Sequence, residues 1–201
     1  MSARPGRATL VLASSSPRRL ELLRQVGFPP DLVLAPEVDE TPLPRELPRD
    51  YARRLARLKA EAVAARLDDG PWFVVAGDTV VAAGRRILPK AEDEATARAC
   101  LERLSGRRHR VWGGVCVLRH DSRRSERVVL TRVRFKRLSR EELEDYLASG
   151  EWRGKAGGYA IQGRAAAFVP WINGSCANVI GLPVAEVVAM LRGLGYRGGA
   201  P

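Results

Sequence analysis

A serine-rich turn followed by two arginines is the first segment that could bind phosphate. The apolar run 9–13 predicts a buried strand, and Ser14-Ser15-Ser16-Pro17 ends it. Ser16 suits a helix N-cap and Pro17 the first helical position, so a helix should begin here. Arg18 and Arg19 then oppose the helix dipole, a penalty that a bound anion would reverse. A capped helix with two exposed arginines is the alternative.

A carboxylate and two lysines form the second set of candidates. Gly77-Asp78-Thr79 interrupts the apolar stretch 72–82, which predicts two strands separated by a break. A carboxylate at a strand end occupies a common catalytic position, although Asp is equally frequent in turns. Lys59 and Lys90 are two of only four lysines. Surface lysines with their stems on apolar neighbours would give the same pattern.

Two loops complete the set of candidate segments. Asp39 and Glu40 are paired carboxylates that could hold a hard divalent ion, or could be solvated acidic residues. Residues 155–163, KAGGYAIQG, combine small residues with Lys and Gln. Such a composition favours backbone packed closely around a ligand, with a plain flexible loop as the alternative.

Several chemistries lack their residues. His109 and His120 are the only histidines, and both have arginine-rich neighbours, which gives little support to a Ser-His-Asp triad or a histidine metal site. Neither a GxxxxGK[ST] nor a GxGxxG motif occurs. Three widely spaced cysteines and the lack of a long apolar segment favour a reduced, cytoplasmic protein without a membrane span.

The chain is strongly basic, with 34 basic and 23 acidic residues and a net charge of +11. This surplus suits small phosphorylated ligands or larger polyanions, and a solvated surface in which Arg replaces Lys would also explain it. No aromatic-studded strand or recognition helix accompanies the charge, so nucleic acid is not expected as the main ligand.

The order of elements predicts an α/β fold with a mixed sheet. Apolar runs predict strands at 9–13, 32–35, 72–76, 80–82, 111–118 and 128–135. A turn signal at 173–174 predicts a hairpin between 168–169 and 179–180. Helical spacing and capping signals predict one helix that begins at residue 17 and further helices at 50–67, 92–104, 139–147 and 183–191. We expect one domain over residues 1–201, with residues 1–7 and 196–201 as flexible termini.

These segments, in this order, resemble the Maf family of nucleotide pyrophosphatases over nearly the whole chain. Leu12–Arg19, LASSSPRR, and the loop 155–163 carry most of the resemblance. It also covers the loop 37–40, Lys59, Gly77–Thr79, Lys90, residues 104–106 and residues 181–183.

The resemblance implies an elongated fold with two lobes around a central cleft, a homodimer, and a divalent metal, Mg or Mn. It further implies hydrolysis of a nucleoside triphosphate between the α and β phosphates. Asp78 would be the proton acceptor, and Asp39 or Glu40 would help Asp78 to hold the metal. The triphosphate would be held by Ser14, Arg18, Arg19, Lys59 and Lys90.

Arg18, Thr79 and Gln162 match the branch of the family that resembles dTTP/UTP pyrophosphatases. A Gln amide both donates and accepts hydrogen bonds, which fits the imide edge of uracil or thymine. The loop 37–42 looks more like the 7-methyl-GTP branch. An inosine-triphosphate-type enzyme and a nucleotide-binding regulator of cell division are further alternatives. Ala76-Gly77 and Lys90-Ala91 depart from the Gly-Ala and Lys-Pro that the family usually has.

Overall fold

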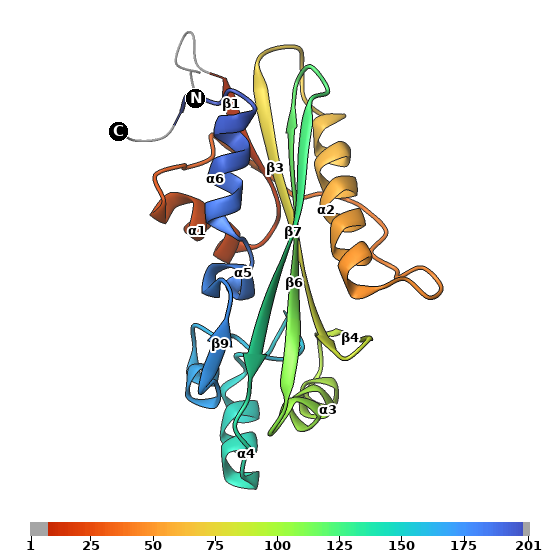
Figure 1. The fold of residues 1–201 in the computed structure, drawn as a ribbon, viewed down its shortest axis with the longest axis vertical. Coiled ribbons are helices and arrows are strands. Elements are labelled where there is room, and N and C mark those ends of the chain that lie inside the picture. The colour runs from red at the N-terminus through yellow and green to blue at the C-terminus, as the bar shows by residue number, and fades with distance from the viewer. Residues whose placement is uncertain (1–7, 199–201) are drawn as a thin grey trace.

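The computed structural model describes residues 8–198 as an elongated α/β fold (Figure 1). Its strands are β1 (Thr9–Ala13), β2 (Leu32–Leu34), β3 (Trp72–Ala83), β4 (Arg86–Leu88), β5 (Lys90–Ala91), β6 (Arg108–Arg119), β7 (Arg124–Arg134), β8 (Lys155–Ala156) and β9 (Trp171–Asn173). Its helices are α1 (Pro17–Gln25), α2 (Pro48–Ala64), α3 (Glu94–Leu104), α4 (Arg140–Ser149), the 3-10 helix η1 (Arg164–Phe168), α5 (Cys176–Ile180) and α6 (Val184–Gly193). The predicted flexible segment 1–7 lies outside the described residues.

The central sheet is mixed, as the sequence predicts. Its strand order is β2-β1-β3-β6-β7-β9, with β4 added to the far part of β3. Strand β1 runs parallel to β2 and β3, whereas β3, β6, β7 and β9 pair antiparallel. Because β3 and β6 each have 12 residues and β7 has 11, these strands run through most of the molecule's length (Figure 1).

Two lobes form because helices cover different parts of the long strands. At one end α2 packs on one face of the sheet, and α1 and α6 pack on the other. We call this end the α2 lobe. At the other end α3, α4 and η1 enclose a separate apolar core around Phe135, Trp152 and Tyr159, and we call it the α3 lobe. The sheet runs through both lobes, and Ile180 of α5 packs against both apolar cores (Figure 1).

An interruption in the pairing of β3 lies between the lobes. Strand β1 ends opposite Ala76, and pairing with β4 covers β3 only from Val81 to Ala83. On its other side β3 pairs with β6 from Phe73 to Ala82 without a break. The predicted strand break at Gly77–Thr79 is therefore wrong, because pairing with β6 overrides the turn tendency of Gly-Asp. Residues 77–80 have no strand beside them on the β1 side, and this gap opens the sheet edge to a ligand.

Two other predictions also fail. The predicted hairpin at Asn173-Gly174 does not form, because Ser175 caps α5 through the backbone of Asn178 and the chain continues as a helix. The predicted flexible end 196–201 begins too early. The Tyr196 side chain is only 2% exposed and packs between Phe28 and Phe73, so terminal position alone is a poor guide to order. Residues 199–201 lie outside the described part of the chain.

Two adjacent glycines allow helices to approach both faces of β6 between the lobes. A Cβ on Gly114 would lie 2.0 Å from the carbonyl oxygen of Ala52 in α2. A Cβ on Gly113 would lie 1.7 Å from Oδ1 of Asn178 in α5. Asn178 is fully buried, and its amide donates to Thr131 Oγ1 at 3.0 Å. The narrow middle of the molecule therefore requires glycine at these two positions.

We expect Gly114→Ala to lower the free energy of unfolding by at least about 3 kcal/mol, because its methyl group would overlap the backbone of α2. Gly193→Ala is the control. It lies in α6 with no atom within 4 Å of its added Cβ, and should raise stability by up to about 1 kcal/mol. Urea unfolding of both variants measures the difference, and equal stabilities would contradict the packing argument.

Candidate functional site

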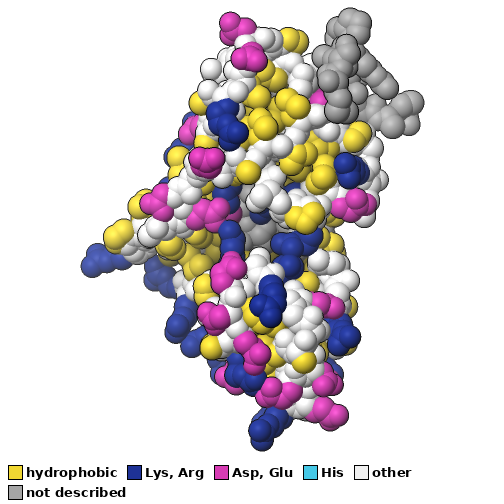
Figure 2. Space-filling model, turned by 180° about the vertical axis from the view of Figure 1, so that it is seen from behind, with side chains coloured by type: hydrophobic (Ala, Val, Ile, Leu, Met, Phe, Trp, Pro, Cys, Tyr) yellow, Lys and Arg dark blue, Asp and Glu magenta, His cyan; other side chains and the backbone are white. Residues whose placement is uncertain are grey.

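A cleft of about 500 Å³ lies at the gap beside β3, between the two lobes. Its size is within the range of about 300–1,000 Å³ typical of small-ligand sites. Figure 2 shows basic and acidic side chains gathered around a hollow at mid-length of the molecule. Among the sequence-predicted site residues, the cleft is lined by Ser14, Arg18, Arg19, Glu40, Lys59, Asp78, Thr79, Lys90 and Gln162.

The sheet places one side of this set at the carboxyl ends of parallel strands. Strand β1 ends at Ala13 and leads directly into Ser14 and the start of α1. The neighbouring strand β2 leads toward the loop that carries Glu40. Ligands of open α/β sheets bind outside such strand ends. The parallel part of this mixed sheet follows that rule.

The two arginines at the start of α1 are fixed by backbone carbonyls at the end of α5. Arg18 Nε donates to the carbonyl of Ile180 at 3.3 Å, and Arg19 Nε donates to that of Gly181 at 2.8 Å. Arg19 also donates to Ser14 Oγ at 3.2 Å and to Thr79 Oγ1 at 3.4 Å. Cations near a helix C-terminus are favourable, so α5 offsets the repulsion from the N-terminus of α1.

Burial lowers the pKa of both arginines, although they stay charged at neutral pH. The pKa of Arg18 is lowered further by the neighbouring charge of Arg19. The carboxylates of Asp78 and Glu40 partly counteract the effect of burial, because their negative charges raise the pKa of Arg19. This site therefore holds partly desolvated guanidinium groups, which bind a phosphate more strongly than hydrated ones.

A chain of four alternating charges spans the cleft. Lys59 Nζ, from α2, lies 2.6 Å from Asp78 Oδ1 and 2.7 Å from Glu40 Oε1. The other Glu40 oxygen lies 2.7 Å from Lys90 Nζ. Lys59 and Asp78 are 4% and 5% exposed, so each needs the other's charge. Although burial alone would raise the pKa of Glu40, hydrogen bonds from Lys59 and Lys90 lower that pKa to about 2.

The acidic loop contributes Glu40 but not Asp39. The Asp39 carboxylate accepts a hydrogen bond from the backbone N–H of Thr41 at 2.8 Å and does not line the cleft. The hydroxyl of Tyr51 donates to the carbonyl of Glu40 at 2.6 Å and holds that residue beside α2. Of the two carboxylates that the sequence offers, the structure therefore brings only Glu40 to Asp78.

The loop 155–163 is attached to the α3 lobe by two buried hydrogen bonds. Tyr159 Oη lies 2.8 Å from His109 Nε2, and the backbone N–H of Ala160 donates to Tyr146 Oη at 3.0 Å. Strand β8 at the start of the loop pairs with β5, which contains Lys90. These contacts favour a positioned ligand loop over a flexible one, and they place the exposed Gln162 at the cleft.

Lys155, from the candidate loop 155–163, also lines the cleft, together with two charged residues that the sequence did not single out, Glu92 and Arg153. Arg153 lies two residues before that loop, and this proximity is the signal that could have found it. With them, the described cleft has six cationic side chains and three carboxylates. A net positive lining suits a polyanionic ligand.

Comparison with known proteins identifies the family. The model of the family described as Maf-like protein matches residues 9–194. The chain belongs to the Maf family. A relative from Rhodospirillum rubrum, named dTTP/UTP pyrophosphatase, is 60% identical over 97% of this chain and 94% of its own. A relative from Paramagnetospirillum magneticum with the same name is 61% identical over 94% and 98%.

The Maf-family chain does not present a dense set of metal ligands. Within residues 8–198 no group of three or more His, Cys, Asp or Glu side chains is arranged to hold a metal ion. The two carboxylates that could do so, Glu40 and Asp78, share Lys59. Over the same residues no helix is both long and apolar enough to cross a membrane.

The buried His109 should make the stability of this Maf-family protein fall in acid. Burial lowers the pKa of His109 from 6.5 to about 4, so between these values only the unfolded chain takes up the proton. The free energy of unfolding should then fall by up to about 3 kcal/mol as the pH drops from 6.5 to 4. Urea unfolding at several pH values should show this loss in the wild type and less of it in His109→Gln. The exposed His120→Gln is the control, and an unchanged pH dependence in His109→Gln would contradict the assignment.

Proposed function

We propose that this protein hydrolyses UTP and dTTP to the monophosphate and pyrophosphate. The observation that carries the proposal is the cleft itself, where five further cations surround a buried Lys59–Asp78 pair. The names of the Maf-family relatives, at about 60% identity over nearly the whole chain, support the same reaction and substrates. The predominance of cations suits phosphoryl chemistry, in which catalysis is mainly positioning and charge stabilisation.

The arginines and lysines would hold the triphosphate. Arg18 and Arg19 lie beside the start of α1, where free backbone N–H groups also point toward an anion. Ser14 Oγ, which accepts from Ser16 N–H and Arg19, fixes that turn. Lys90 is exposed, and within residues 8–198 its ammonium group pairs only with Glu40, so an incoming phosphate can replace that carboxylate as its partner.

Asp78 would act as the proton acceptor. In the proposed step it takes a proton from water as the water oxygen bonds to the α phosphorus. The bond from that phosphorus to the bridging oxygen breaks, and the electron pair leaves with pyrophosphate. Lys59, whose Nζ lies 2.6 Å from Asp78 Oδ1, orients that carboxylate and offers positive charge to the phosphoryl oxygens.

A divalent metal, Mg²⁺ or Mn²⁺, is part of the proposal. Glu40 and Asp78 are carboxylates of the type these ions prefer, and both lie within 2.7 Å of Lys59 Nζ. Two ligands fit an ion that keeps waters and binds substrate phosphates, rather than one enclosed by protein. When bound, it would neutralise phosphate charge and lower the pKa of a water.

Base selection would depend on Arg18, Thr79 and Gln162. All three line the cleft, and Gln162 lies on the loop that His109 and Tyr146 attach to the α3 lobe. The amide can pair with the imide of uracil or thymine. The 7-methyl-GTP, inosine-triphosphate and cell-division-regulator readings are the competing functions. A homodimer in the cytoplasm is proposed from the family resemblance.

Asp78→Asn should lower kcat for UTP by about 10²- to 10⁴-fold, because it removes the proton acceptor while Lys59 keeps Glu40 as a partner. The assay separates pyrophosphate from orthophosphate over a panel of nucleoside triphosphates with Mg²⁺ or Mn²⁺. Asp69→Asn, in an exposed loop, is the matched control and should keep full activity. Activity mainly on inosine or 7-methylguanosine triphosphate would contradict the pyrimidine assignment. No turnover at all would favour the regulator.

Gln162→Glu should reduce the preference for UTP over CTP by tenfold or more, about 1.4 kcal/mol. The substituted carboxylate cannot donate to a uracil carbonyl but can accept from the amino group of cytosine. The ratio of kcat/KM for the two nucleotides measures the change. Gln25→Glu, on the exposed surface of α1, should leave that ratio unchanged. An unaltered ratio in Gln162→Glu would remove this residue from base recognition.

A further inference from the structure

Four arginines form a regular cluster on one face of the sheet, away from the cleft lining. Arg108 pairs directly with Arg134, and Arg110 pairs directly with Arg132, across β6 and β7. Residues two apart on a strand point to the same face, so the four side chains share one surface. All four are exposed. We call this surface, together with Trp171 of β9, the arginine face.

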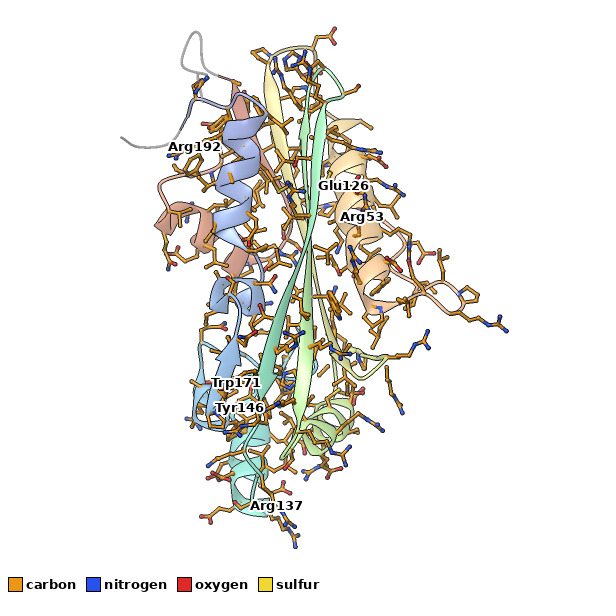
Figure 3. The ribbon with its side chains drawn as sticks, viewed as in Figure 1. Arg53, Glu126, Arg137, Tyr146, Trp171 and Arg192 are labelled. Carbon is orange, nitrogen blue, oxygen red and sulfur yellow. The ribbon has the colours of Figure 1, made fainter. Side chains whose placement is uncertain are left out.

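The arginine face has no acidic partner within residues 8–198, whereas several other arginines of the described surface have one. Arg53 pairs with Glu126 (Figure 3), Arg98 with Glu144 and Arg164 with Glu151. No ion pair or side-chain hydrogen bond involves Arg108, Arg110, Arg132 or Arg134 within residues 8–198. Like charges directly opposite each other destabilise a sheet. The fold therefore tolerates a repulsion that a bound polyanion would relieve.

Aromatic and amide groups lie in the same rows of the sheet as these arginines. Trp171 pairs with Arg134, and the guanidinium of Arg108 lies over its indole, 5.1 Å from the ring centre. Asn173 pairs with Arg132 in the next row. Trp171 comes from a strand distant in sequence (Figure 3), so the sequence alone did not show an aromatic beside the basic strands.

We infer that the arginine face binds single-stranded nucleic acid independently of sequence. A basic surface that follows the phosphates, with an aromatic on which a base can stack, is the usual composition of such sites. The net charge of +11 favours the same partner, and the four arginines on this face disfavour a second copy of the chain at this surface. An acidic protein partner fits less well, because five of the six exposed large apolar residues of the described surface lie outside β6, β7 and β9. The sixth, Ile172, alternates with Trp171 and Asn173 along β9 and so points to the opposite face of the sheet.

The test measures fluorescence anisotropy of a labelled single-stranded oligonucleotide, about 20 nucleotides long, which exceeds the ~4–16 nucleotides of one such site. A non-hydrolysable UTP analogue fills the cleft throughout, so that binding there does not contribute. The slope of log K against log salt should be about −3, because four phosphate contacts contribute about −0.7 each. Arg110→Thr with Arg132→Thr should reduce the slope by about 1.4 and weaken binding at least tenfold.

Arg127→Thr with Arg137→Thr is the matched control, since it removes the same charge from two exposed positions outside the face. It should leave the slope unchanged. Because Arg110 and Arg132 repel each other, their double variant should melt no lower than the wild type and should keep UTP hydrolysis. Trp171→Leu should also weaken oligonucleotide binding. Unchanged UTP hydrolysis by this variant would show that it is still folded.

Absence of oligonucleotide binding, or equal weakening by the control pair, would overturn the inference. Displacement of the oligonucleotide by polyglutamate at equal charge concentration, with no effect of Trp171→Leu, would indicate an acidic polypeptide as the partner instead. The cleft is the same in the arginine-face pair and in the control pair, so the difference between them does not depend on which nucleotide the cleft hydrolyses. This inference and the proposed function therefore fail separately.

Discussion

The unequal pairing of the two edges of β3 is the constraint on which the site depends. One edge pairs with β6 over ten consecutive residues, whereas the other loses β1 after Ala76 and gains β4 only at Val81. The paired edge keeps Asp78 in a fixed, extended backbone, and the gap on the other side gives a ligand access to it. A true strand break, as the sequence suggests, would have left the carboxylate on a looser turn. Gly113 and Gly114 then let α5 and α2 approach the same part of the sheet from both faces.

Electrostatic balance explains why the cleft is stable with so many cations. Glu40 is shared between Lys59 and Lys90, and carbonyls at the end of α5 hold Arg18 and Arg19. The Glu40 carboxylate thus lies beside the same cations that a bound phosphate would contact, and a phosphate would compete with it for them. Binding a triphosphate exchanges one anion for another rather than creating a charge pair from solvent. The free-energy cost of removing Lys59 and Asp78 from water arises during folding, so it does not oppose binding of the triphosphate.

The sequence predicts the elements better than the way they are joined. Strong periodicity and capping signals, such as the Ser139–Glu142 capping box of α4, gave correct helices. The failures at Gly77–Thr79 and Asn173-Gly174 share one cause, since local turn chemistry was overridden by a distant partner, β6 in one case and the β6–β7 contacts of α5 in the other. For the same reason the sequence named both Asp39 and Glu40, whereas contacts with Tyr51, Lys59 and Lys90, all eleven or more residues away, place Glu40 in the cleft.

The cleft and the arginine face show two treatments of clustered positive charge in one chain. In the cleft, each buried cation is matched by a carboxylate or a carbonyl, as burial requires. On the arginine face the guanidinium groups are hydrated, so opposing like charges cost only tenths of a kcal/mol per pair and folding alone does not remove them. Composition counts both sets as the same net charge of +11. The register of β6, β7 and β9 gathers four cations without carboxylate partners on one surface, apart from the cations that the cleft has neutralised.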